Sequence, residues 1–307
     1  MNLLVVGTLA YDSVETPFGK RDNILGGSAS YAAVCASYFC PVQMVGIVGR
    51  DFNEEHLAFF RGKGIDTNGV EHASGQTFRW SGRYEENMNI RHTLVTELNV
   101  LEQFKPAVPA SFRDTPYLIL GNFDPSLQLS VLDQMTSPRL VACDTMNFWI
   151  DGYREALDRT LARVDVLLVN DSEARELSGE HNLLKAARGV RAMGPSLIVI
   201  KLGEHGAMLL DDEGLFLAPA FVLEQIMDPT GAGDSFAGGM MGFLARQDRW
   251  DSKTLRQAMV LGTVMASFSV QDFSIDSVRD LNTSNIEARV AEFRDLTQVS
   301  LDGTRLE

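Results

Sequence analysis

The sequence contains little cysteine, little histidine and a shortage of positive charge. Three cysteines among 307 residues are too few for a disulfide framework, which favours a reducing compartment, so we expect a cytoplasmic protein. The five histidines include no pair at the spacing of zinc ligands, which argues against a zinc site. Lysine and arginine total 27 against 41 aspartates and glutamates, a formal net charge of -14, so we expect no nucleic-acid partner.

Long hydrophobic runs, the features of a signal peptide and the P-loop motif are also missing. A membrane-spanning helix needs about 20 consecutive apolar residues, and no run approaches that length, so no membrane partner is expected. Residues 1–7 lack the basic flank and cleavage site of a signal peptide. The chain has no Gly-x-x-x-x-Gly-Lys-Ser/Thr loop, which excludes a P-loop ATPase.

The chain does contain a regular alternation of short apolar runs and helix-like stretches. The apolar runs are rich in Val, Ile and Leu without polar alternation, which is typical of strands covered on both faces. Strands that alternate with helices indicate a mostly parallel sheet. The predicted strands are residues 3–7, 42–49, 117–122, 140–144, 164–170, 197–203 and 207–211. The predicted helices are residues 27–39, 53–62, 126–135, 153–163 and 183–193, with a largely helical segment after 231.

One region breaks this rhythm. Residues 77–84 alternate aromatic and polar side chains, and residues 92–101 also have an extended pattern, with a polar turn between them. Residues 10–23 are likewise unlike a helix. We therefore expect a small β appendage formed from about 10–23 and 75–102. Because an isolated hairpin is marginal in water, it should pair with other strands or with a second subunit.

The strongest motif is Asp228-Pro229-Thr230-Gly231-Ala232-Gly233-Asp234. Apolar residues after it recur at helical spacing, so a helix should begin within or just after Gly231-Ala232-Gly233. Amides in the first turn of a helix have no intrahelical partner, and small residues leave them uncovered, which makes an anion site. Asp234 would lie in that first turn.

A carboxylate beside an anion site has two interpretations. Asp234 could simply be an acidic residue favoured by the helix dipole, with the glycines forming a turn. Alternatively, the carboxylate handles a substrate hydroxyl while the amides hold a transferring phosphoryl group. The whole seven-residue run favours the second interpretation. It closely resembles the signature of the ribokinase-like sugar and nucleoside kinases, the PfkB family.

Four weaker motifs follow the same family pattern in the expected order. They are Asp12 after the first strand, Gly26-Gly27 before the first long helix, Asn170-x-x-Glu173 after a mid-chain strand, and Gly203-x-x-Gly206 after the next strand. The resemblance therefore spans nearly all of residues 1–307 as one domain. It implies a three-layer α/β/α body with a mostly parallel central sheet, and a small β-sheet lid that covers the substrate and often forms a dimer interface.

The resemblance also implies roles for individual residues. The implied activity is ATP-dependent phosphorylation of a hydroxymethyl group on a sugar or nucleoside, with Asp234 as the base and an anion hole of Gly231, Ala232 and Gly233. The implied substrate contacts are Asp12, Gly26, Gly27 and Tyr31. The implied ATP contacts are Asn170, Lys201, Gly203, Gly206 and Thr230. Glu173 would order Mg²⁺ through water, and Asp228 matches a residue near a K⁺ site in some members.

Each of the weaker motifs has a structural alternative. Gly26-Gly27 could be a strand-to-helix turn, and Gly203 with Gly206 a hairpin turn between strands. Asn170 with Glu173 could be a helix capping box. Two positions also depart from the family pattern: Ala10 and Tyr31 stand where ribokinase has asparagines that contact the sugar, which makes plain ribose a doubtful substrate.

Other side chains leave the acceptor class open. Aromatic residues at strand ends could favour an apolar moiety such as a nucleobase; these are Phe123, Phe148 and Trp149. Three arginines of the predicted lid could meet a sugar phosphate, or could be solvated charges; these are Arg79, Arg83 and Arg91. The lid aromatics Phe78, Trp80 and Tyr84 could contact substrate or only pack the lid.

Two other function classes fit the sequence less well than a kinase. A non-catalytic nucleotide- or sugar-binding regulatory protein on the same fold is compatible with the altered Ala10 and Tyr31 positions, although an intact Asp234 argues against it. A nicotinamide dehydrogenase is disfavoured, because Phe236 follows Gly231-x-Gly233 where the dinucleotide fingerprint requires glycine.

Overall fold

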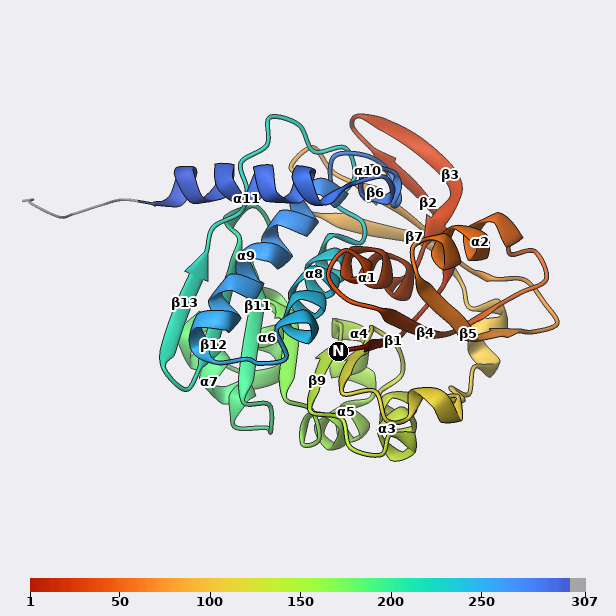
Figure 1. The fold of residues 1–307 in the computed structure, drawn as a ribbon, viewed down its shortest axis with the longest axis horizontal. Helices are drawn as coiled ribbons and strands as arrows, with labels where there is room; N and C mark the ends of the chain where they lie inside the picture. The colour runs from red at the N-terminus through yellow and green to blue at the C-terminus, as the bar shows by residue number, and fades with distance from the viewer. Residues whose placement is uncertain (299–307) are drawn as a thin grey trace, which may run out of the picture.

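The computed structural model describes residues 1–298, which contain a central sheet of nine strands (Figure 1). In chain order these are β1 (Leu3–Val6), β4 (Val42–Val48), β5 (Ile65–His72), β8 (Tyr117–Leu120), β9 (Leu140–Asp144), β10 (Val166–Asn170), β11 (Leu197–Lys201), β12 (Ala207–Asp211) and β13 (Gly214–Ala218). Their order in the sheet is β13-β12-β11-β10-β9-β8-β1-β4-β5. Neighbours are parallel except β11–β12 and β12–β13, which confirms the mostly parallel sheet.

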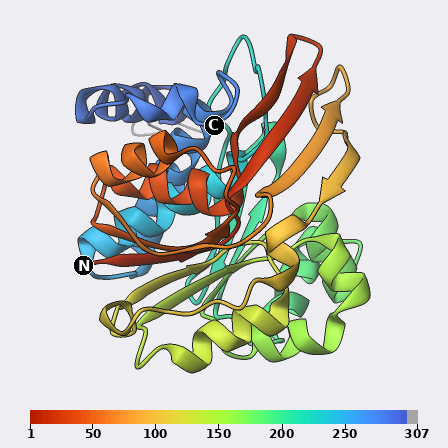
Figure 2. The same ribbon diagram turned by 90° about the vertical axis from the view of Figure 1, so that its right-hand side faces the viewer.

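Most of these strands are apolar because helices cover both faces of the sheet, whereas the edge strand β5 also contains polar residues. In β1, Leu3 and Val5 join one hydrophobic cluster, whereas Leu4 and Val6 join the other. Consecutive side chains of a strand point to opposite faces, so a strand between two layers cannot alternate apolar and polar residues. Figure 2 shows the red and blue helices on one side of the sheet and the green helices on the other.

The two helical layers come from different parts of the chain. The first layer contains α1 (Ser28–Ser37), α2 (Glu54–Gly62), α8 (Ala232–Gln247), α9 (Ser252–Ser269), α10 (Asp276–Arg279) and α11 (Thr283–Thr297). The second contains α3 (Pro125–Gln134), α4 (Asn147–Gly152), α5 (Arg154–Leu161), α6 (Asp171–Ser178) and α7 (Leu183–Arg191). The fold is therefore the three-layer α/β/α body expected from the family resemblance.

A second, four-stranded sheet projects from this body, and we call it the lid. Its strands are β2 (Ala10–Thr16), β3 (Gly19–Gly26), β6 (Phe78–Tyr84) and β7 (Arg91–Glu97), in the order β3-β2-β6-β7. Strands β2 and β6 pair in parallel, which joins two hairpins into one sheet. Figure 2 shows it rising beside the body as red and orange arrows. The joining of the two hairpins removes the instability of an isolated pair.

The edges of the appendage differ from the sequence prediction. Strand β3 continues to Gly26 instead of stopping near residue 23, and β7 ends at Glu97. The prediction that residues 98–101 are extended is wrong, because Asn99–Gln103 form a 3₁₀ helix. The reason is that Val100 turns into the body and is fully buried in one of the two large hydrophobic clusters.

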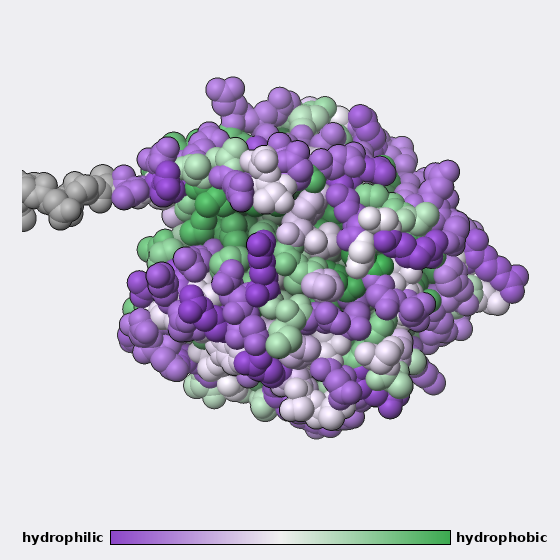
Figure 3. Space-filling view, viewed as in Figure 1, coloured by the Kyte–Doolittle hydropathy of each residue, from purple (hydrophilic) through white to green (hydrophobic). Residues whose placement is uncertain are grey.

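The surface is mainly hydrophilic in the view of Figure 3. Hydrophobic atoms gather at the upper left, where Figure 1 shows β13, α9 and α11. Strand β13 is an edge strand, and its Leu215 and Leu217 side chains are 44% and 64% exposed. Within residues 1–298, no helix has both the length and the apolar composition needed to cross a bilayer.

Candidate active site

Side chains from three neighbouring strands and one helix meet at the carboxyl edge of the central sheet. Asp144 ends β9, Asn170 ends β10 and Lys201 ends β11, while Asp234 lies in the first turn of α8. The three strands are parallel neighbours, so their carboxyl ends share one edge, where α/β proteins usually bind ligands. Of these four residues, Asp144 is the one that the family motifs do not include. Its signal in the sequence is a carboxylate that ends an otherwise apolar strand.

Helix α8 begins within the glycine-rich motif, as the sequence predicts. Its N-cap, Gly231, has φ 75°, a left-handed conformation that favours glycine. The Tyr31 ring lies against this glycine, because a Cβ at position 231 would be 2.5 Å from three ring carbons. The Ala232 amide donates to the Pro229 carbonyl at 3.2 Å. Of the three predicted anion-hole amides, those of Gly231 and Gly233 form no backbone hydrogen bond within the described residues.

The Lys201 ammonium lies beside this helix start. Its Nζ is 2.9 Å from Asp144 Oδ2 and 3.0 Å from the position that a Gly233 Cβ would occupy. Burial lowers the pKa of Lys201, but the carboxylates of Asp144 and Glu173 outweigh it, so the pKa is raised overall and the amine stays charged. A cation next to unpaired helix amides is a site suited to phosphate oxygens.

The Asp234 carboxylate is partly exposed and lies in the same turn. Its pKa is raised to about 7, mainly by loss of water contact and also by the charge of Asp144, with the Lys201 ammonium acting in the opposite direction. A carboxylate with a pKa near neutrality can accept a proton from a hydroxyl group as that group reacts. The turn therefore combines a base with a place for an anion.

Asn170 and Glu173 form a capping box at the start of α6. Asn170 Oδ1 accepts a hydrogen bond from the Glu173 amide, and Glu173 Oε2 accepts one from the Asn170 amide, each at 2.8 Å. The helix capping box, which the sequence offers as the structural alternative for Asn170 and Glu173, is thus present in the structure. Burial raises the pKa of Glu173 to about 7, with Lys201 lowering it and Asp144 raising it. Glu173 Oε1 takes no part in the box.

Asp12, Gly26 and Gly27 lie where β2, β3 and α1 meet. The Asp12 carboxylate lies so close to Gly26 that no Cβ would fit there, and Gly27 is the N-cap of α1 with φ 93°. The local backbone geometry therefore accounts for the presence of glycine at both positions. The pKa of Asp12 is raised to about 7, mainly by burial and also by the charges of Asp228 and Asp234. Asp12 thus belongs electrostatically to the same site as Asp234.

Buried polar atoms without a partner gather around this site. Within the described residues, six buried side-chain nitrogen or oxygen atoms lack a hydrogen-bond partner. Four of the six belong to the site or adjoin it: Tyr31 OH, Thr145 Oγ1, Asp228 Oδ2 and Ser235 Oγ. Such atoms are rare in native proteins and each requires an explanation, for which an absent ligand or water is the usual one.

Two hydrogen bonds connect the lid to loops at the sheet edge. From β6, the Tyr84 hydroxyl lies 3.1 Å from the hydroxyl of Thr230, in the motif before α8. From the β6–β7 turn, Asn89 Nδ2 donates to Glu204 Oε1 at 3.1 Å, in the loop between β11 and β12. The lid therefore touches two of the three segments for which the family resemblance implies contact with ATP.

The loop between β11 and β12 is a tight turn that contains a 3₁₀ helix, Gly203–His205. Gly203 and Gly206 both have positive φ, 57° and 94°, and a side chain at position 206 would collide with the Ala218 carbonyl. The turn alternative therefore accounts for both glycines by itself. Its position next to Lys201 leaves its backbone at the edge of the site.

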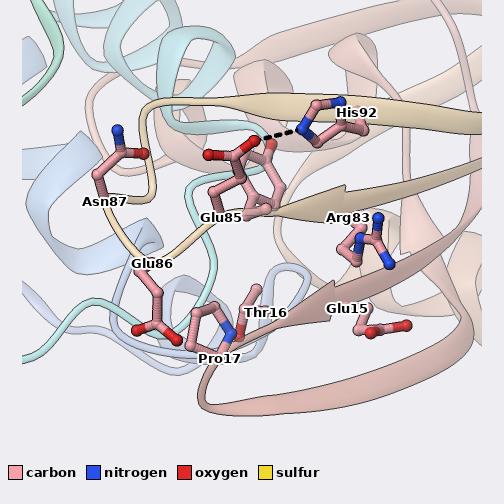
Figure 4. A pocket seen from close by; sticks show the side chains of 9 residues that line it. Glu15, Thr16, Pro17, Arg83, Glu85, Glu86, Asn87 and His92 are labelled. Carbon is pink, nitrogen blue, oxygen red and sulfur yellow. Dashed lines mark hydrogen bonds and ion pairs between the residues drawn. The ribbon is translucent and has the colours of Figure 1, made fainter.

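A hollow of about 540 Å³ opens at the tip of the lid (Figure 4). Its lining includes three carboxylates, Glu15, Glu85 and Glu86, with Arg83 on β6. His92 and Glu85 lie 2.6 Å apart across its rim. The hollow is bounded by Tyr84 on the side of the site, but it contains none of the strand-end residues. Arg83 is thus a lid-tip residue, which supports its interpretation as a solvated charge.

The other lid arginines are placed differently. Arg79 pairs with Asp51 at 2.8 Å, so its charge is already matched. The Arg91 guanidinium lies over the Trp80 ring, 5.5 Å from its centre, and lowers the pKa of both Glu173 and Asp234. Arg91 therefore faces the strand-end side of the site.

The strand-end aromatic residues do not form one surface. Phe123 is buried and packs against Phe104 with ring centres 6.4 Å apart, so it belongs to the core. Phe148 is 57% exposed on α4, next to Trp149, whose Nε1 donates to Asn122 Oδ1 at 2.8 Å. Only the α4 pair remains available to an apolar part of a ligand.

The residues present fit the ions that the resemblance implies. No group of three or more His, Cys, Asp or Glu side chains in the described chain could hold a metal by itself. Mg²⁺ keeps several waters and uses one or two carboxylates together with substrate phosphates, and the Glu173 carboxylate beside Lys201 suits that mode. Asp228 Oδ2 is buried without a partner, as an oxygen awaiting a monovalent cation would be.

Comparisons with known proteins agree with this fold. Residues 5–279 match the family described as pfkB family carbohydrate kinase. The chain is 29% identical over 254 residues to a cytidine kinase of Thermococcus kodakarensis, covering 80% of this chain and 89% of the relative. It is 25% identical over 292 residues to a 1-phosphofructokinase of Haemophilus influenzae, covering 88% and 86%. The nucleoside kinase structure of Methanocaldococcus jannaschii superimposes with a TM-score of 0.76 at 18% identity, covering 95% and 98%.

The fold, with a cation and a carboxylate at a helix start on the sheet edge, agrees with that of the α/β kinases named above. The chain belongs to the pfkB carbohydrate kinase family, whose related members here are sugar and nucleoside kinases.

Proposed function

We propose that this protein transfers the terminal phosphoryl group of Mg-ATP to a hydroxymethyl group of a sugar or nucleoside. The observation that carries the proposal is the first turn of α8, where Asp234 lies beside Lys201 and the Gly231 and Gly233 amides. The acceptor oxygen would bond to the terminal phosphorus as its proton passes to Asp234. The bond from that phosphorus to ADP would break, and ADP would leave.

The positive groups of the turn would stabilise the transferring phosphoryl group. Its three equatorial oxygens carry negative charge that needs fixed donors and cations. Gly231 and Gly233 amides and the Lys201 ammonium would supply them, and Ala232 would join them if its amide leaves the Pro229 carbonyl. Asp144 would hold Lys201 in place through their ion pair of 2.9 Å.

The donor nucleotide would lie along the loops after β10 and β11. Asn170, Gly203, Gly206 and Thr230 adjoin this edge, and the lid touches the loop after β11 and the segment before α8. Glu173 would hold Mg²⁺ through water. The ion would neutralise charge on the ATP phosphates when bound. Asp228 would take part in a K⁺ site beside the same helix start.

The acceptor would lie on the opposite side of Asp234, against Asp12, Gly26, Gly27 and Tyr31. One relative is named as a cytidine kinase and another as a 1-phosphofructokinase. A nucleoside and a sugar phosphate are different classes of acceptor, so the relatives leave the acceptor class open. Lid contacts with both sides would exclude water, which would otherwise compete as the acceptor.

A homodimer formed through the lid, in the cytoplasm, completes the proposal. Strand β7 is an edge strand exposed along its whole length. Its Leu94 and Val95 side chains are 52% and 49% exposed. Exposed apolar edge strands are liable to pair with another chain, and a second lid is the partner that symmetry favours.

The test is a coupled ADP-release assay with Mg-ATP and a panel of nucleosides, free sugars and sugar phosphates. We expect turnover on at least one acceptor class. Asp234→Asn should lower kcat by roughly 10²–10⁴ while the protein remains folded. Asp248→Asn is the matched control, because it changes an aspartate just after the other end of α8. No acceptor-dependent ADP release with the whole panel, while ATP still binds, would favour a regulatory binding protein instead.

A further inference from the structure

Gln128 is a buried polar side chain in a helix whose other buried residues are apolar. It lies on α3 and is 1% exposed. Burial of an amide is unfavourable unless its polar atoms find partners, so a side chain such as methionine would fill this place at lower cost. The glutamine is therefore expected to serve the groups that it contacts. The other buried residues of the helix are Pro125, Leu129, Val131 and Leu132.

The amide of Gln128 joins the ends of two strands of the central sheet. Its Nε2 donates to the Gly121 carbonyl at 2.8 Å and to the Asp144 carbonyl at 3.1 Å. The thiol of Cys143 donates to its Oε1 at 3.5 Å, which is a weak hydrogen bond. Two carbonyl oxygens can accept only from the nitrogen, so these neighbours fix the orientation of the amide.

These contacts are made at the point where β8 and β9 separate. The pairing of the two strands ends at Leu120 and Cys143. Gly121 and Asp144 would be the next pair, but the Gln128 amide bridges their carbonyl groups instead. Asp144 stays in register with β10 on its other side. Strand β9 thus leaves β8 while it remains beside β10, and Gln128 is the side chain that ties the two strand ends together.

The position of Asp144 matters because its carboxylate holds Lys201. Its Oδ1 accepts a hydrogen bond from the Thr145 amide at 2.8 Å, and its Oδ2 pairs with Lys201 Nζ at 2.9 Å. The ammonium in turn lies 3.0 Å from the position that a Gly233 Cβ would occupy. A continuous series of contacts therefore leads from Gln128 through Asp144 and Lys201 to the first turn of α8.

We propose that Gln128 is a positioning residue, which fixes the end of β9 so that Asp144 holds the Lys201 ammonium beside the first turn of α8. A lysine side chain is flexible, so its ammonium is placed by the partner that it binds. The inference rests on the proposed kinase function, in which this ammonium stabilises the transferring phosphoryl group. It adds a residue that belongs to none of the sequence motifs.

The decisive variant is Gln128→Met, which keeps a side chain of similar length and removes both hydrogen bonds. We expect kcat to fall roughly 10–10²-fold, as for a small displacement of a reacting group, while the KM for the acceptor stays unchanged. In isothermal titration, Mg-ATP should lose more affinity than Mg-ADP, because only ATP carries the terminal phosphoryl group. The Tm should also fall, because two buried carbonyl groups lose their partner.

Gln134→Met is the matched control at the other end of the same helix. Gln134 Nε2 likewise donates to two carbonyl groups, those of Pro106 and Ser130, at 2.8 and 2.9 Å. Its Oε1 accepts from the Val108 amide at 2.9 Å. The control should therefore lose stability and keep the kcat and the nucleotide affinities of the wild type. The same kcat in both glutamine variants, or an equal loss of ATP and ADP affinity in Gln128→Met, would overturn the inference.

A double-variant cycle separates positioning from a general loss of structure. If Gln128 acts through Lys201, Gln128→Met should change kcat little when Lys201→Met is already present. Losses that multiply in the double variant would overturn the inference and leave the kinase function standing. If Gln128→Met does not fold, Gln128→Asn takes its place in the cycle, because it keeps an amide that is too short to reach both carbonyl groups. Absence of acceptor-dependent ADP release by the wild-type protein would overturn the proposed function itself, and this role with it.

Discussion

Replacement of Lys201 by methionine would test how charge is arranged at the sheet edge. The change keeps the length of the side chain and removes the ammonium that lies 2.9 Å from Asp144. Removal of one partner from a buried pair costs about 3–5 kcal/mol, because the remaining charge is left uncompensated. The Lys201 side chain keeps 20% exposure, so we expect a loss near the lower limit, about 3 kcal/mol in the free energy of unfolding.

The same change should move the pH dependence of activity in a direction that the structure fixes. Asp234, the proposed base, must be ionised to accept a proton, and its pKa is raised to about 7. Lys201 lowers that pKa and Asp144 raises it. The rise of kcat/KM with pH should therefore shift to higher pH in Lys201→Met and to lower pH in Asp144→Asn. The double variant should lie between the two.

The assay is kcat/KM from pH 5 to 9 with the acceptor found in the panel, together with urea unfolding of each variant. The structure predicts kcat at pH 7.5 lower by roughly 10²-fold in Lys201→Met, because a cation at the transferring phosphoryl group is lost. Asp144→Asn should restore part of the lost stability when added to Lys201→Met, since it removes the unpaired carboxylate. Shifts of both single variants in the same direction would refute the proposed arrangement, as would pH profiles identical to the wild type.

Three further predictions follow from other parts of the site. Asp12 has a pKa raised to about 7, so the folded protein binds more protons than the unfolded chain between about pH 4 and pH 7, and stability should fall as pH rises through this window. Differential scanning fluorimetry should show a ligand-free Tm several degrees higher at pH 5.5 than at pH 7.5, with a smaller difference in Asp12→Asn; a Tm that rises with pH, or the same difference in both proteins, would contradict this. Gly231→Ala should destabilise by about 2–4 kcal/mol, because position 231 has φ 75° and a Cβ would meet the Tyr31 ring at 2.5 Å; a loss under about 0.5 kcal/mol in urea unfolding would show that the Tyr31 ring moves freely. Leu94→Glu should convert a lid-mediated dimer to monomer in light scattering without loss of Tm, and a wild-type protein that is monomeric at all concentrations would remove the dimer proposal.

The lid is part of this arrangement. Tyr84 touches the hydroxyl of Thr230 and Asn89 touches Glu204, so each lid contact reaches a loop proposed to bind phosphates. A change in the position of either loop on ATP binding would therefore be transmitted to the lid through one hydrogen bond.

Local patterns in the sequence predicted seven of the nine strands of the central sheet, all except β5 and β13. Continuous apolar runs such as β10 and β11 are diagnostic of strands covered on both faces, and the motif at Gly231 marked the start of α8 correctly. Strand β5 was not predicted, because Ile65–His72 contains polar residues and a glycine and lies at the sheet edge with one exposed side. The extended prediction for residues 98–101 failed because burial of Val100 overrides the local pattern.

The sequence by itself determined the order of the motifs, because each depends on neighbours along the chain: a glycine where φ is positive, an acid in the first turn of a helix, an apolar strand before a polar end. Only the tertiary structure decided which of these groups meet. Asp144 joins Lys201 because β9, β10 and β11 are parallel neighbours. Tyr31 lies against Gly231 because α1 packs on α8, 200 residues later in the chain. Charge pairing and burial act through space, so a pattern along the chain cannot specify them.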